Sequence, residues 1–252
     1  MSKRNSFFMG NYAKPYQGIE VASVGALHDL GQYFDDEFGR RFRYAKNGGV
    51  ALVAGHAVQS SVLAGATTTL QTAATVAVAS NLEDTRIFIN ALTTAQDASL
   101  FKDGMAAFYD ASLAGGYFRL VKDNNALATT GVVSYIDLYE PLPVALTTSD
   151  TVALSINPYS GTIIVPVTTP TGKILGVAPT AVPISYYFWV QTRGWAALHL
   201  KDGAVAAGIV KVGGSTAGSG ISNTESLFSQ DIGIASAAWA DESCGLVYLT
   251  CE

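Results

Sequence analysis

Three histidines are the side chains of this chain that most readily hold a metal ion. His28, His56 and His199 lie in three separate segments, and none has a second ligand type at a useful spacing on one face. Closed metal sites need clustered histidine, cysteine or carboxylate groups. We therefore expect each histidine to lie at the surface or to pack among strands, and we expect no metal or other cofactor.

The two cysteines, Cys244 and Cys251, are seven residues apart. On a strand, an odd separation places two side chains on opposite faces, which disfavours a disulfide between them. Two cysteines are also too few for a disulfide framework. The sequence predicts two buried free thiols.

Glycine-rich segments could form a nucleophile turn or a phosphate-binding loop, but their context fits neither. The run at 213–220 has no G-x-S-x-G motif and no strand-to-helix transition around it. Gly172-Lys173 lacks the upstream glycine of a P-loop. Both segments are expected to be loops without a catalytic role.

Paired carboxylates could cleave a polysaccharide, because glycosidases use two of them. The acidic residues cluster at 35–37, 83–84 and 241–242, at expected turns. Neighbouring side chains on a strand point to opposite faces, so adjacency does not build an acid–base pair. The sequence therefore predicts that the chain is not an enzyme, although a pair brought together by the fold is left open.

Aromatic residues form the last constellation, at 186–189 and at Trp195, on one expected hairpin closed by Arg193-Gly194. A row of exposed rings could bind a sugar or a partner protein. Alternatively, alternate rings fill a core while the others meet a neighbouring subunit, and we favour this interpretation because buried rings anchor most β cores.

Period-2 alternation indicates the elements that position these residues. In 41–46, Phe42 and Tyr44 share one face and Arg41 and Arg43 the other, as in a half-buried strand. Many short strands with turn signals every 8–12 residues or so predict an all-β fold, a small barrel or sandwich of antiparallel strands. Short helices are expected only at 95–100 and 223–229. The expected strands are 41–46, 50–58, 85–91, 105–109, 116–121, 132–138, 152–156, 162–167, 174–177, 186–191, 195–200, 204–212, 232–237 and 246–251.

Charged residues make up only 14% of the chain, against about 25% in an ordinary soluble domain. A surface with so few charges is poorly protected against association, so we expect neighbouring subunits to cover much of it. Serine and threonine could instead solvate the surface of a β domain. The net charge of −5 and the lack of a basic run argue against a nucleic-acid partner. No apolar stretch approaches the roughly 20 residues that span a bilayer, and the first residues do not resemble a secretory signal.

Several segments resemble tailed-phage virion structural proteins. Residues 36–44 followed by 48–55 resemble the opening of such proteins, and 132–142 and 157–161 resemble their middle. The C-terminal third resembles small head-decoration domains, in the pieces 176–178, 187–194, 203–212, 231–235 and 245–249. In compact members, the strand that resembles 50–58 leads almost directly to the segment that resembles 176–178. In this chain, roughly 110 residues lie between the two. The resemblance implies a virion structural protein and no catalytic residue.

An inserted domain accounts for these extra residues. We expect residues 1–35 to be an extended N-terminal arm, 36–60 and 170–252 to form one discontinuous decoration-like β-barrel, and 61–169 to form an inserted β domain. Insertion at an exposed hairpin costs little, because loop-closure entropy grows slowly with length. The alternative is two consecutive β domains split near 140–170.

The resemblance and the composition together predict a capsid decoration or cement protein on the exterior of the virion, assembled in the host cytoplasm. Its expected partners are the major capsid protein lattice and copies of itself, as a homotrimer, with no nucleic acid, membrane or small-molecule substrate. A tail-associated receptor-binding or carbohydrate-binding module is the alternative. The residues expected to carry the contacts are Phe7, Phe8, Tyr12, Tyr16, Arg41, Arg43, Tyr186 and Trp195.

Overall fold

A computed structural model describes residues 17–61, 71–90, 95–112, 115–127, 129, 133–167, 170–201, 203–212, 215–222 and 230–252. Strands and turns, without a helix, form this described part, so the predicted all-β class is confirmed.

The chain divides into two compact units. Unit 1 comprises residues 1–61 and 159–252, and unit 2 comprises residues 62–158. Residues 159–169, which the sequence assigned to the inserted domain, lie in unit 1. The side-chain Oγ of Ser61 donates to the backbone oxygen of Ser160 at 3.1 Å, so the two ends of unit 1 that flank unit 2 lie side by side.

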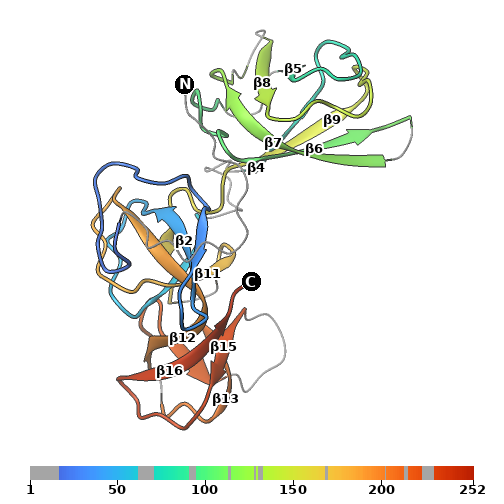
Figure 1. Cartoon of the computed structure of the whole chain (residues 1–252). Helices are drawn as coiled ribbons and strands as arrows, with labels where there is room; N and C mark the ends of the chain where they lie inside the picture. Colours follow the sequence, from blue (N-terminus) through green and yellow to red (C-terminus); the bar gives the residue numbers. More distant parts are fainter. Residues whose placement is uncertain are drawn as a thin grey trace. The chain divides into compact units, whose positions relative to one another are not determined.

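The described residues of unit 2 form six antiparallel strands, coloured green to yellow in Figure 1. They are β4 (Gln71–Thr75), β5 (Arg86–Ile89), β6 (Met105–Asp110), β7 (Gly115–Asn124), β8 (Ser134–Leu138) and β9 (Thr151–Ser155).

These strands follow the order β4-β9-β6-β7-β8-β5. The chain just after β4 reaches β5, because Val76 forms a bridge with Ile89 and the nitrogen of Ala77 donates to the oxygen of Phe88 at 2.8 Å. The sheet therefore closes into a small barrel. Its buried core includes Ile87, Ile89, Phe101, Phe108, Val121, Leu127, Ile136, Val152 and Leu154.

In unit 1, the described residues form ten strands in one continuous sheet. They are β1 (Tyr33–Asp35), β2 (Arg41–Lys46), β3 (Ala57–Gln59), β10 (Ile163–Ile164), β11 (Ile174–Val177), β12 (Tyr187–Leu200), β13 (Gly208–Val212), β14 (Gly220–Ser222), β15 (Asp231–Ala235) and β16 (Ser243–Thr250).

The long strand β12 belongs to two groups of strands. Its first half pairs with β2 and β11, and its second half pairs with β16 and, at Leu200, with β14. Because β14, β13, β15 and β16 also pair in turn, the second group closes on itself. The pairing of β2 with β12 joins two segments that lie on opposite sides of unit 2 in the sequence. The core of the closed group includes Leu198, Leu200, Val210, Val212, Ile232, Val247 and Leu249.

Residues 17–35, which the sequence assigned to an arm, lie on their own unit where the structure describes them. The ring nitrogen of Trp189 donates to the backbone oxygen of Gln17 at 2.9 Å, and the hydroxyl of Tyr44 donates to the side-chain oxygen of Gln17 at 2.8 Å. The rings of His28 and Phe34 pack on Trp189 at centroid distances of 4.9 and 4.8 Å. This segment therefore covers the aromatic cluster of β2 and β12.

Three local predictions are wrong. Arg193-Gly194 does not close a hairpin: β12 runs through it, and Gly194 adopts a φ of 84° beside a register shift against β2. Residues 95–100 form turns rather than a helix, because Ser99 has a φ of 62°. The expected strand at 50–58 overlaps the observed strand β3 (Ala57–Gln59) only in its last two residues. The expected helix at 223–229 lies outside the described residues.

Candidate interaction surface

Carboxylates of the acidic clusters at 35–37 and 83–84 bind arginines or a turn. Asp35 binds Arg41 at 2.7 Å, Asp36 binds Arg40 at 2.6 Å, and Asp84 accepts a backbone hydrogen bond at 2.6 Å. Among the described residues, no group of three or more histidine, cysteine or acidic side chains is arranged to hold a metal ion. These carboxylates bind arginines and turns instead.

Both cysteines are free thiols in different environments. Cys244 is exposed, so the prediction that both thiols are buried is wrong, because Cys244 lies on the outward face of β16, opposite His199. Burial raises the pKa of the Cys251 thiol to about 12. Cys251 is therefore protonated and unreactive at neutral pH.

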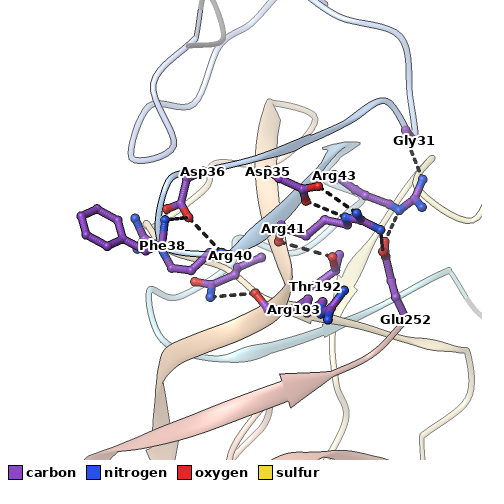
Figure 2. A network of polar contacts seen from close by, with 11 residues as sticks. Gly31, Asp35, Asp36, Phe38, Arg40, Arg41, Arg43, Thr192, Arg193 and Glu252 are labelled. Carbon is purple, nitrogen blue, oxygen red and sulfur yellow. Dashed lines mark hydrogen bonds and ion pairs between the residues drawn. The ribbon is translucent and has the colours of Figure 1, made fainter. Parts of the chain in front are cut away.

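Arg41 and Arg43, two of the predicted contact residues, lie in an ion-pair network within unit 1 (Figure 2). The Nε and Nη2 atoms of Arg41 donate to the two carboxylate oxygens of Asp35 at 2.7 and 2.8 Å. Glu252 binds both arginines, with its Oε2 atom 3.1 Å from Nη1 of Arg41. Arg43 also donates to the backbone oxygen of Gly31 at 2.8 Å. The network joins β2 to β1 through Asp35 and to the end of the chain through Glu252.

The pKa values of the acids reflect this pairing. The hydrogen bond from Arg41 lowers the pKa of Asp35. Burial alone would raise the pKa of Glu252, but hydrogen bonds from Arg43 and Arg41 lower it overall. The ring of Tyr33 lies 4.6 Å from the guanidinium carbon of Arg41 and 5.4 Å from that of Arg43. Both arginines thus have ion-pair partners within unit 1.

Trp195, another predicted contact residue, begins an apolar row across four neighbouring strands. Trp195 on β12 is opposite Tyr248 on β16, Tyr248 is opposite Ile234 on β15, and Ile234 is opposite Ile209 on β13. Directly paired residues of antiparallel strands lie on the same face. We call these four residues the apolar row.

The apolar row lies on the outward face of the sheet. Trp195 is 47% exposed, Ile234 50% and Ile209 53%. The ring of Trp195 meets that of Tyr248 edge-on at 5.4 Å. Leu246, also 50% exposed, is opposite Ala197 in the next outward pair and widens the patch. Clustered apolar side chains on a sheet face indicate an interaction surface, whereas scattered ones do not.

Unit 2 has an outward face of the same kind. Its direct pairs place Ala153, Ala107 and Phe118 in one row, and Tyr109 in the next row. Phe118 is 55% exposed and Tyr109 49%. None of the side chains in these positions is charged, so this face is also suited to burial against another protein.

The remaining predicted contact residues do not join the apolar row. Tyr186 is half-buried and packs against the core that includes Phe188 and Val190. Phe7, Phe8, Tyr12 and Tyr16 lie outside the described residues. Sequence reasoning missed Tyr248, Ile234 and Ile209, although large apolar residues at the outward positions of short strands were a signal that could have found them.

Two histidines stack on each other beside the closed group of strands. The ring centroids of His56 and His199 are 4.8 Å apart, with the ring planes at 15°. The buried Nδ1 atom of His199 has no hydrogen-bond partner in the described structure. Burial lowers the pKa of His199, with His56 and Lys201 acting in the same direction and Asp241 against it. Burial also lowers the pKa of His28, although Gln32 and Asp29 oppose this.

Unit 1 is therefore expected to lose stability in mild acid. His28 and His199 both have folded pKa values below 6.5, so the unfolded chain binds more protons than the folded chain in mild acid. The stability that these two neutral histidines contribute is therefore present above about pH 6.5 and is lost as the pH falls through their folded pKa values. Tryptophan fluorescence reports on unit 1 alone, since Trp189, Trp195 and Trp239 all lie there. His199→Gln should weaken the dependence of Tm on pH, and an unchanged dependence would exclude His199 as a source.

No protein-family model, curated protein or solved structure matches the chain. The described residues form no helix that is long and apolar enough to cross a membrane. The outward sheet faces are therefore the features of the molecule from which a function is inferred.

Proposed function

We propose that this protein is a non-enzymatic structural protein of a virus particle, a decoration or cement protein on the head of a tailed phage. It binds the lattice of the major capsid protein and copies of itself, as a homotrimer on the outside of the shell. The apolar row is the observation that carries the proposal, because a half-exposed apolar surface on a chain with 14% charged residues favours burial against a partner.

The energetics of such a surface fit repeated contacts. Covering a half-exposed large apolar side chain contributes about 1 kcal/mol, so the row alone makes a weak interface. A regular shell offers many equivalent sites, and linked weak contacts become effective together. The two outward faces, one on each unit, give a single chain more than one such contact.

The experiment is co-sedimentation of the purified chain with empty shells assembled from the major capsid protein of the same phage. We expect saturable binding of the full chain and a loss of roughly tenfold or more in affinity when residues 1–16 are deleted, since about 1.4 kcal/mol corresponds to tenfold. The deletion stops before Gln17 because residues 17–35 cover Trp189 and Tyr44, so a longer deletion would also weaken the fold. Unchanged affinity without residues 1–16 would show that this segment does not contribute to shell binding. No binding by the full chain would refute the proposal.

A tail-associated receptor-binding or carbohydrate-binding module is the second candidate. The half-exposed ring of Trp195 favours it, because aromatic faces stack on sugars. The apolar neighbours Ile234 and Ile209 oppose it, since they offer a sugar no hydrogen bond. Binding of the chain to glycans that Trp195→Ala abolishes would favour this candidate over decoration.

A further inference from the structure

One strand, β12, carries both a covered and an uncovered aromatic side chain. Trp189 in its first half is 1% exposed, and residues 17–35 cover it through Gln17, His28 and Phe34. Trp195 in its second half is 47% exposed and opens the apolar row. The chain thus already uses its N-terminal region to cover aromatic side chains of this strand.

Residues 1–16 have the composition of a segment that would cover the row. They contain Phe7, Phe8, Tyr12 and Tyr16, a far higher share of rings than the 10% of the whole chain. They contain three basic residues and no acidic one, whereas the whole chain has 15 basic and 20 acidic residues. The rest of the chain therefore carries 12 basic and 20 acidic residues, a net charge of −8, which attracts this segment to any copy of the protein.

The fixed starting point and the length of this segment set which rows it can reach. Gln17 is fixed beside Tyr187, since its side-chain nitrogen donates to the backbone oxygen of Tyr187 at 2.9 Å. Trp195 lies about 25 Å further along β12 at the usual rise per residue. Sixteen extended residues reach roughly 50 Å, enough for the row of the same chain or of a neighbouring copy, and the proposed assembly function favours the neighbouring copy.

We propose that residues 1–16 of one copy bind the apolar row of a neighbouring copy. Phe7 and Phe8 pack on Trp195, Tyr248 and the two isoleucines. This inference rests on the proposed assembly function and names the element that links one subunit to the next.

Photo-crosslinking between two co-expressed full-length chains tests it. The first chain carries benzoylphenylalanine in place of Phe8 and the substitutions Ile209→Ser and Ile234→Ser, which remove the two isoleucines of its own row. The second chain keeps Phe8 and the native row. We expect crosslinks from position 8 to peptides of the second chain that contain Trp195, Ile234 or Tyr248. In the reciprocal pair, where only the photoreactive chain has a native row, these crosslinks should fall roughly tenfold or more.

A matched control separates the row from apolar surface in general. Phe118→Ser on the second chain removes an exposed ring of unit 2 and should leave the crosslink yield unchanged. Crosslinks to the row only within one chain, or none to the row at all, would overturn the proposal. No shell is present in this experiment, so a failed crosslink with intact shell binding refutes only the inference, and intact crosslinking without shell binding refutes only the proposed function.

Discussion

Trp189→Ala is expected to lower the free energy of unfolding of unit 1 by about 3–5 kcal/mol, the usual cost of removing a buried tryptophan. Trp189 is 1% exposed and is packed against Tyr44, His28 and Phe34. The substitution also leaves the backbone oxygen of Gln17 without its indole donor. Both effects release residues 17–35 from β12, so protease sensitivity in this segment should rise together with the loss of stability.

Trp195→Ala is the matched control, because it removes the same side chain from an exposed position of the same strand. Its expected cost is at most about 1 kcal/mol. Denaturant unfolding followed by fluorescence measures both variants, since two tryptophans of unit 1 remain in each. Equal losses in the two variants would contradict the described packing of residues 17–35 on Trp189.

Gly176→Ala is expected to destabilise unit 1 by about 2–5 kcal/mol through steric overlap and backbone strain. Gly176 on β11 has a φ of 149°, and an added Cβ atom would lie 1.9 Å from the backbone oxygen of Gln191 on β12. The alanine must therefore push β11 away from β12, where Val177 is paired with Gln191.

Gly49→Ala is the control for this substitution, because a Cβ atom there would meet nothing within 4 Å. Its expected effect is below about 0.5 kcal/mol. Thermal unfolding of the two variants compares them directly. A Gly176→Ala protein as stable as the Gly49→Ala protein would show that β11 does not approach β12 as closely as described.

Alternation and turn residues were sufficient to predict the class of the fold. The pattern of Phe42 and Tyr44 against Arg41 and Arg43 gave the strand β2 with its correct faces, because burial on one side of a strand imposes a period of two. The same rules failed at Arg193-Gly194, where a glycine with positive φ bends a continuous strand instead of closing a turn. Local sequence does not distinguish these two uses of glycine, since both need the same backbone conformation.

The apolar row could be predicted only in part. Trp195 was named from the sequence, and the strands that hold Ile209, Ile234 and Tyr248 were expected approximately where they occur. Their alignment depends on the register of three strand pairs, and register is set by packing across the sheet rather than by the residues of one strand. The ion pairs of the arginines could not be predicted for a related reason, because Glu252 lies 209 residues from Arg43 in the sequence and its pairing is visible only in the fold.

The number of copies of this protein in purified virions, measured by quantitative mass spectrometry against the major shell protein, tests the assembly function most directly. A decoration protein that lies on a repeating lattice is present in hundreds of copies, in a fixed ratio to the shell protein. A handful of copies would place the protein in a tail or fibre, and its absence from the particle would contradict a structural role in the virion altogether.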